Sequence, residues 1–542
     1  MDPPTTALFV RLQQHLTAIV TEEPPPELDA VLVRTFTSSL ADTPATRPQL
    51  GLLPLTILAL ETTTSDAAPL AQCILRLLRD VPFTEVLQIT SEAQILATLS
   101  SPAAAFQRLG LELLHKAAKT PNEAGMLASW PAVMKALLRV LLLGEETATA
   151  QFASDVLLEL LKVDSIATGG AGVVWRRVFG DEGVYRVFFE STKVGEGGRA
   201  GHAQSRLLEL MPRIAACDWE LVCRSRFPAV EAEYFEVLEE RDGREYGGLL
   251  YYVAAKMVAD REDVMMHMLL LEFYTVLFGA SKKRALAFLE DLGIVREVVA
   301  LALRPEEYTD DSIDVDLLQP KACAFVGTLI THFPSRLSQP ADKPLGGELL
   351  KLITHHLSEP YAPPHSPTLT LLRALPPAFL VGKNIVSLLP LSPPHPEFLR
   401  TLALLLPHEP LYREYAAASS DMYERLTALS ETLVHGQSAV EALNIIAAIA
   451  ASEGNWGVQE ILNAPGVMGM LAKLPEQSLG AGRDTDGAAW RVLRRRWEVA
   501  KTVEERLEGG SPWKGRMQER VAGGVVRRVG AGERVEVATE GM

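Results

Sequence analysis

Four short stretches of the chain share one pattern of apolar and polar positions. In each stretch a glutamate stands between two pairs of almost exclusively apolar residues, within sequence that favours helix. We call this pattern the notch motif. Because the flanking residues cover one broad face of a helix, the glutamate is expected to point away from that face. The stretches are 110–114, 157–161, 207–211 and 270–274, and a weaker relative at 74–78 has arginine in the polar place.

The notch motifs recur at intervals typical of helical repeats. Their glutamates, Glu112, Glu159, Glu209 and Glu272, are 47, 50 and 63 residues apart. Units of about 40–47 residues with two or three helices are typical of armadillo and HEAT arrays, in which each unit buries its apolar face against its neighbours. The sequence therefore predicts an all-α fold, an armadillo or HEAT-repeat right-handed superhelix (α-solenoid) of about 11–12 repeats.

Apolar periodicity and helix-start signals predict individual helices and the breaks between them. The last three helices of the N-terminal part form an expected three-helix unit. We expect one continuous solenoid over 1–508 and a loosely ordered tail over 509–542. The expected helices are 8–19, 27–40, 50–61, 67–80, 91–99, 102–119, 130–143 and about 145–163, and the expected connections include 169–172, 195–201, 242–248, 304–320, 360–367 and 390–396.

Composition agrees with a helical scaffold and limits the classes of partner. Hydrophobic residues make up 48% of the 542 residues and aromatic residues 6%, so runs that favour strands are scarce. The formal net charge of −16 argues against a large phosphate-binding surface, and no nucleic-acid partner is expected. An acidic scaffold is better matched to a basic protein partner.

Motifs for catalysis, cofactors and metals are missing from the sequence. The four cysteines are too few for a disulfide framework, and Cys217 and Cys223 lack the spacing of a zinc hairpin. There is no phosphate-binding loop and no nucleophile elbow. The chain is therefore expected to be a non-enzymatic protein without cofactors. No secretory signal or membrane-spanning run is found, so a cytoplasmic or nuclear protein, monomeric when free, is expected.

Two charged segments have competing interpretations. The late cluster Arg491 and 494–496, flanked by Trp490 and Trp497, is interpreted as a helix with an apolar seam and a solvated basic face; stacking of nucleic-acid bases is the alternative. The acidic segment 304–320 is interpreted as a solvated loop, and the alternative is a contact for a basic partner.

The C-terminal third carries a family resemblance. Residues 440–450 form a nearly continuous apolar helix, followed by Trp456, Ile461-Leu462 and the sequence Asn-Ala-Pro-Gly at 463–466. This order resembles the last repeat of the proteasome non-ATPase regulatory subunit five family. The helix around 489–503 and the closing Val-Glu-Val-Ala-Thr-Glu-Gly are also similar to that family's end, and weaker similarity covers about 70–330. The chain departs from the family at 164–201, at 358–396 and in its arginine-rich late helix.

The resemblance implies a chaperone for assembly of the base of the proteasome regulatory particle. Such a chaperone binds the C-terminal domain of one base ATPase subunit, delays docking on the core particle and leaves before the proteasome is complete. Two other classes stay open. One is another armadillo or HEAT scaffold, such as a transport or trafficking adaptor. The other is a DNA-repair factor, which would need a basic groove that the net charge opposes.

The four notch glutamates are the candidate partner-binding residues. If equivalent helices stack, Glu112, Glu159, Glu209 and Glu272 form a ladder along one side of the superhelix. We expect the ATPase domain to lie in the concavity and to contact this ladder, together with the loop 306–316. An acidic strip would attract lysines or arginines of the partner and speed the encounter. The alternative is an ordinary solvated helix face.

Overall fold

The computed structural model divides the chain into two compact units, residues Met1–Leu292 and Gly293–Met542, and each is described by itself. We call them unit 1 and unit 2. The structure describes the whole chain except residues 1–2, 41–46, 64–65, 167–168, 194–198, 236–246, 259–262, 305–311, 338–344, 359–365, 392–394, 432–435, 455, 473–487, 508–510, 523–524, 530–532 and 538–542.

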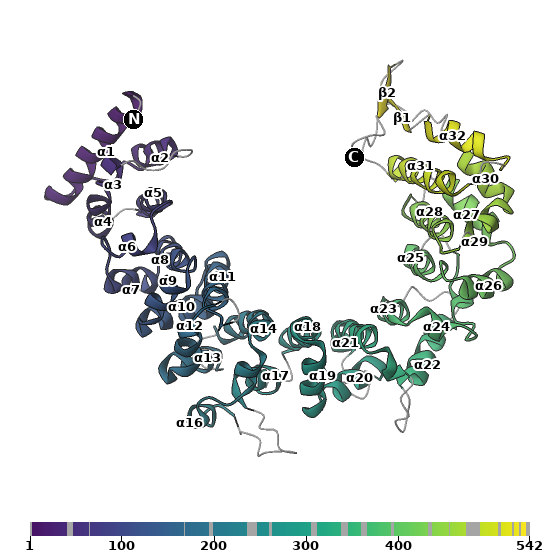
Figure 1. Ribbon diagram of the computed structural model, residues 1–542, viewed down its shortest axis with the longest axis horizontal. Coiled ribbons are helices and arrows are strands. Elements are labelled where there is room, and N and C mark those ends of the chain that lie inside the picture. Colours follow the sequence, from purple (N-terminus) through teal and green to yellow (C-terminus); the bar gives the residue numbers. More distant parts are fainter. Residues whose placement is uncertain are drawn as a thin grey trace. The chain divides into compact units, whose positions relative to one another are not determined.

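Unit 1 is built from helices stacked in two rows (Figure 1). Within the first row, which we call the notch row, each helix packs on the next: α2 (Ala30–Ser39), α5 (Ala68–Leu78), α8 (Ala104–Ala117), α11 (Thr147–Val163), α14 (Ala200–Cys217) and α18 (Val264–Ala280). The second row holds their partners: α1 (Pro3–Thr21), α4 (Leu53–Thr62), α7 (Glu92–Ser100), α10 (Pro131–Leu143) and α13 (Glu182–Thr192). Each pair buries its apolar face between the rows, as in HEAT and armadillo repeats.

Shorter helices connect these pairs. Helix α9 has the clearest start signal in the sequence, although it was not among the three helices expected over 102–163. Thr120 caps it by accepting from the Glu123 amide, and Pro121 occupies its first turn, where no amide donor is needed. The connecting helices are α3 (Arg47–Leu50), α6 (Phe83–Val86), α9 (Pro121–Ala128), α12 (Val173–Gly180), α15 (Trp219–Cys223), α16 (Pro228–Glu231), α17 (Gly248–Ala255) and α19 (Lys282–Asp291).

Unit 2 repeats the two-row plan. One row runs through α21 (Ser312–His332), α23 (Ser366–Ala374), α25 (Pro396–Leu405), α28 (Gly436–Ala450) and α31 (Ala488–Arg506). The remaining elements are α20 (Ile294–Leu303), η3 (Pro334–Leu337), α22 (Leu345–Ser358), α24 (Pro377–Leu380), η4 (Val386–Leu388), α26 (Glu409–Ala418), α27 (Met422–Glu431), α29 (Trp456–Leu462), α30 (Pro465–Ala472), α32 (Lys514–Ala522), β1 (Val525–Val529) and β2 (Glu533–Val537). The prediction of an all-α solenoid of armadillo or HEAT type is confirmed.

Two predicted irregular segments hold regular structure. The predicted loop 304–320 is wrong from residue 312, where α21 begins and continues through Pro320. Residues 305–311 of that loop lie outside the described residues. Beyond residue 508, where the solenoid was expected to end, α32 packs on α31 and buries Met517 and Arg520. Strands β1 and β2 then pair antiparallel, with Val525 opposite Val537.

Candidate functional site

The notch motif separates a buried face from an exposed position on each helix. In α11 the four leucines at 157, 158, 160 and 161 are at most 1% exposed, whereas the side chain of Glu159 is 50% exposed. Glu209 and Glu272 are also exposed, and Glu112 is half-buried. The apolar pairs cover the arc that faces the other row, so the glutamate is left on the outer arc.

The four glutamates lie on successive helices of the notch row. Glu112 is on α8, Glu159 on α11, Glu209 on α14 and Glu272 on α18, and each of these helices packs on the next (Figure 1). The structure therefore brings the four candidate residues onto one row, as the repeat spacing predicted. Their surroundings differ from one end of the row to the other, and this difference defines two grooves.

The first groove runs between α5 and α8 and is dominated by cations. It has a volume of about 660 Å³, and small side chains of Ala68, Ala71 and Ala105 leave it open. We call it the basic groove. Among the described residues that line it, Glu112 alone carries a carboxylate. Its lining residues are Thr37, Ala68, Ala71, Gln72, Leu75, Arg76, Arg79, Ala105, Arg108, Glu112, His115, Lys116 and Lys119.

Lys116 and His115 of this groove contact neighbouring elements of the fold. The buried Lys116 ammonium donates to the carbonyl oxygens of Arg79 and Val81, 3.0 Å from each, at the end of α5. Burial lowers the pKa of Lys116, while nearby carboxylates oppose that shift. His115 Nε2 lies 2.7 Å from Glu159 Oε2, which joins α8 to α11. Lys116 and His115 therefore hold neighbouring elements together.

The second groove lies among α11, α14 and α18 and contains two of the candidate glutamates. It has a volume of about 510 Å³. We call it the acidic groove, because Glu209 and Glu272 both line it. Its other lining residues are Leu141, Thr147, Ala150, Gln151, Ser154, His202, Ser205, Arg206, Leu208, Pro212, Leu269, Phe273 and Val276.

The cation of the acidic groove is bound within the fold. Arg206 Nη1 donates to the carbonyl oxygens of Leu141 and Leu142, 3.3 and 3.0 Å away, at the C-terminal end of α10. The last carbonyls of a helix carry the negative end of its dipole, which favours a cation at this place. Burial lowers the pKa of the Arg206 guanidinium. Glu209 has no ion pair among the residues that the structure describes. Glu209 and Glu272 are the two carboxylates among the described residues that line this groove.

The ladder of four glutamates does not present a uniformly acidic surface. Glu112 stands among the cations of the basic groove, and Glu159 is occupied by His115. Between them and the acidic groove, Asp155 of α11 accepts from Arg213 of α14 at 2.8 Å. Only Glu209 and Glu272 share one groove. The predicted contact loop 306–316 belongs to unit 2, and its first part, to residue 311, lies outside the described residues.

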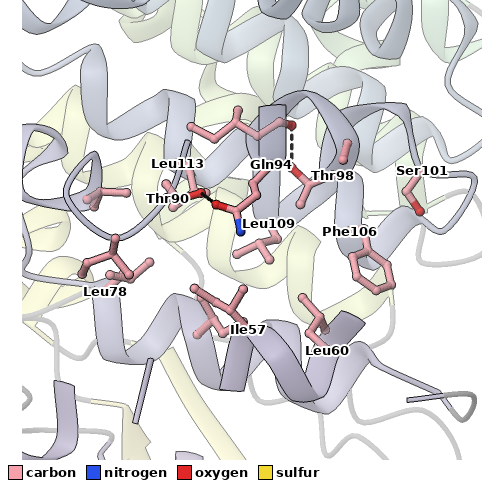
Figure 2. A pocket seen from close by; sticks show the side chains of 15 residues that line it. Ile57, Leu60, Leu78, Thr90, Gln94, Thr98, Ser101, Phe106, Leu109 and Leu113 are labelled. Carbon is pink, nitrogen blue, oxygen red and sulfur yellow. Dashed lines mark hydrogen bonds between the residues drawn. The ribbon is translucent and has the colours of Figure 1, made fainter. Parts of the chain in front are cut away.

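An apolar cavity of about 240 Å³ lies on the other side of α5 and α8 (Figure 2). Ile57, Leu60 and Leu78 line one side of it, and Phe106, Leu109 and Leu113 come from α8. Its polar side chains are paired internally: Thr90 Oγ1 donates to Gln94 Oε1 at 3.3 Å, and Thr98 Oγ1 donates to the Ile95 carbonyl at 2.7 Å. The cavity offers apolar packing space and no charged group.

The arginine-rich helix α31 is engaged in contacts within unit 2. Arg494 and Arg495 pair with Glu498, and Arg496 donates to the Ser430 carbonyl at 2.7 Å. Trp497 donates its indole N–H to the Val521 carbonyl of α32 at 3.1 Å. These contacts favour the interpretation of an apolar seam with a basic face over a base-stacking platform.

Within the described part of the chain, no group of three or more His, Cys, Asp or Glu side chains is arranged to hold a metal ion. The four cysteines are free, and burial raises the pKa of the Cys73 thiol to about 11 and that of Cys323 to about 12. No single described helix is long and apolar enough to cross a membrane; α9 and α10 reach the length only together and are bent by 96°.

Sequence reasoning missed the basic groove, although its signal was present. Arg108 lies four residues before Glu112 and shares its helical face, and Lys119 follows two residues after the end of α8. Arg76 and Arg79 occupy the corresponding stretch of the preceding repeat. Reading the glutamates alone, without the residues one turn away, hid this change of charge.

Both units thus belong to the class of α-solenoids built from stacked helical pairs. No protein-family model matches the sequence, and no curated protein is recognisably similar to it. Among solved structures the chain is similar to importin beta at 10% identity and a TM-score of 0.43, with 94% of this chain and 64% of that chain covered. It is also similar to Kap121p in a complex with Nup53p, at 11% identity and a TM-score of 0.44, with 95% and 49% covered. The chain spans about half to two-thirds of the length of these two proteins.

Proposed function

We propose that the chain is a non-enzymatic scaffold that binds a protein partner along the notch row of unit 1. The observation that carries this proposal is the acidic groove, in which Glu209 and Glu272 lie beside apolar Leu269 and the 58%-exposed Val276. Two carboxylates next to apolar surface suit a segment that presents lysine or arginine together with an aliphatic side chain.

The finer proposal is that the partner is the C-terminal domain of a base ATPase subunit, and that the chain chaperones assembly of the proteasome regulatory-particle base. The support is the sequence resemblance at 440–466. In unit 2 these residues form the end of α28, the short helix α29 beginning at Trp456, and the start of α30 at Pro465. The chaperone would bind the ATPase before the base docks on the core particle, in the cytoplasm or the nucleus.

The experiment that tests the finer proposal is quantitative capture with the tagged full chain from its own cells. Base ATPases are expected at high enrichment, without core-particle subunits. Recovery of transport cargo or nucleoporins in their place would overturn the chaperone function and favour the transport-adaptor class. The scaffold proposal itself is overturned if no protein binds the purified chain directly.

Direct binding is then measured with the purified ATPase C-terminal domain. The double variant Glu209→Lys/Glu272→Lys is expected to weaken binding. Its matched control is Glu424→Lys/Glu453→Lys, which makes the same change of charge at two exposed positions of unit 2. Equal weakening in both variants would show that net charge, and not the acidic groove, governs the interaction.

A further inference from the structure

The basic groove is an exception in a chain with a net charge of −16. Arg76 and Arg79 line it from the α5 side, and Arg108 and Lys119 from the α8 side. Lys116 adds a buried ammonium at its base. Against these cations the described lining residues offer one carboxylate, that of Glu112. Within a low-dielectric cleft such a set of charges produces a positive potential that attracts anions.

Two of the cations are available to a ligand. Arg108 is exposed and lies 6.0 Å from the ring of Phe152, and Lys119 is exposed at the end of α8. In the described parts of the chain, neither side chain has a carboxylate partner. Lys116 already donates to two backbone carbonyls, and His115 already makes a hydrogen bond with Glu159. Arg108 and Lys119 are therefore the side chains that an anionic ligand would meet first.

The shape of the groove suits a polypeptide segment. Ala68 and Ala71 on α5 and Ala105 on α8 leave space between the two helices, and the volume of about 660 Å³ is large enough for several residues. Leu75 adds an apolar contact within the same lining. The groove therefore combines charge for carboxylates with space for a backbone.

We propose that the basic groove docks an acidic segment of the partner protein, so this inference rests on the proposed protein-binding function. An acidic peptide is favoured over nucleic acid for two reasons. The lining residues that the structure describes include no Phe, Tyr or Trp on which bases could stack, and Glu112 would repel a continuous phosphate backbone. A peptide can place its carboxylates at Arg108 and Lys119 and leave a neutral residue at Glu112.

The test uses the full chain and a fluorescein-labelled peptide of about twelve residues that alternates acidic residues with leucine. Fluorescence anisotropy is recorded at about 20 mM and about 150 mM salt, because exposed charge pairs are screened at the higher ionic strength. The unlabelled version of the peptide is expected to displace it, and a version with lysine at each acidic position is not. Failure of the acidic peptide to bind at the lower salt would overturn the proposal.

The deciding variant is Arg108→Glu/Lys119→Glu. It is expected to bind the acidic peptide roughly tenfold more weakly at low salt, because two attractive charges become repulsive. The matched control is Lys282→Glu/Lys283→Glu at exposed positions of α19, which is expected to leave the affinity nearly unchanged. Circular dichroism and thermal melting check that both variants fold as the parent does.

Three results would overturn the assignment of the groove. One is equal weakening in both double variants, which would point to net charge alone. Another is unchanged binding in Arg108→Glu/Lys119→Glu. The third is a single-stranded oligonucleotide that binds more tightly than the peptide and whose binding is lost in the same variant.

If capture recovers a protein partner while the peptide fails to bind, only the groove assignment fails. If the peptide binds and no protein partner exists, the proposed function fails instead.

Discussion

The basic and acidic grooves lie on the same row of helices and are built around the same motif. In both, a glutamate stands between buried apolar pairs, and in both the core side of the helix is leucine-rich. The residues one turn away from the glutamate differ. Four residues before and three after the glutamate, α8 carries Arg108 and His115, whereas α18 carries Met268 and Thr275. The repeated motif therefore sets the helix and its packing, while the flanking turns set the chemistry of the surface.

Regular spacing of the notch motif along the chain does not imply a surface of uniform charge. The glutamates recur because each helix needs a polar residue on its outer arc. The residues four before and four after them differ in both type and exposure, from the exposed Arg108 and Val276 to the buried Lys116. Binding specificity along such a row is therefore expected to vary from one groove to the next.

The largest expected effect comes from a substitution in α11, which packs on α8 of the basic groove and on α14 of the acidic groove. Leu161 is fully buried there, so Leu161→Ala removes packing from the core and leaves a cavity. We expect a loss of about 2–5 kcal/mol in the free energy of unfolding, measured by chemical denaturation. Hydrogen exchange should quicken in α8, α11 and α14 and change little in α2, because repeats interact with their nearest neighbours. Uniform quickening across unit 1 would contradict the repeat architecture.

A smaller effect is expected from Gly110→Leu, a substitution in α8 that should alter the basic groove and leave the acidic groove unchanged. Gly110 takes the place of a leucine in the notch motif of α8, because α7 approaches closely there. A Cβ atom at Gly110 would lie 2.8 Å from Thr98 Oγ1 and 2.9 Å from Leu99 Cγ. Gly110→Leu should therefore cost about 1–3 kcal/mol through overpacking and should shift α8 away from α7.

The readout of this variant is binding at each groove. The acidic peptide should bind Gly110→Leu more weakly, while a lysine-bearing partner segment should bind the acidic groove as it does in the parent. Gly469→Leu serves as a control, because a Cβ atom there meets no atom within 4 Å. Equal stability of Gly110→Leu and the parent protein would contradict the close approach.

Charge reversal in the acidic groove should act mainly on the rate of association. Glu209→Lys/Glu272→Lys replaces two attractive charges with repulsive ones, and we expect the association rate of a basic partner to fall several-fold at low salt and less at high salt. Adding Glu159→Lys should contribute little more, since His115 already occupies that carboxylate. Stopped-flow measurement at two ionic strengths separates these cases. A larger effect of Glu159→Lys alone would show that the ladder acts as one unit.

The smallest expected effect concerns the contact between the neighbouring helices α8 and α11. His115 and Glu159 are 40% and 50% exposed, so their pairing at 2.7 Å is screened by solvent. A double-mutant cycle of His115→Ala and Glu159→Ala should give a coupling free energy of about 0–1 kcal/mol. A coupling well above that range would make this pair a structural link between the grooves.

Much of the helical plan could be predicted from the sequence. The expected helices at 91–99, 130–143 and about 145–163 agree closely with α7, α10 and α11, because apolar periodicity is strong there. Serine at the start of α7 and proline at the start of α10 add a helix-start signal. The stacking of the notch helices also followed from the repeat spacing. Helix α9 was missed because its eight residues are too few to show a clear period, although Thr120-Pro121 marked its start.

The grooves were harder to predict, because they depend on residues from helices that are distant in sequence. The acidic groove needs Thr147, Glu209 and Glu272 to meet from three helices, and no local pattern carries that information. Charge was also a misleading signal in unit 2. The acidic segment 304–320 was interpreted as a solvated loop, but Asp314 lies in the first turn of α21, where a carboxylate is placed favourably near the positive end of the helix.

The separation of core-facing and outward positions in the notch motif has a consequence for how this protein can change over time. Substitutions at exposed helix positions usually alter stability by less than about 0.5 kcal/mol. Residues such as Arg108, Lys119 and Val276 can therefore be exchanged one repeat at a time while the leucines beneath them stay constant. The set of partners bound along this row can therefore change one substitution at a time, and each intermediate sequence still folds.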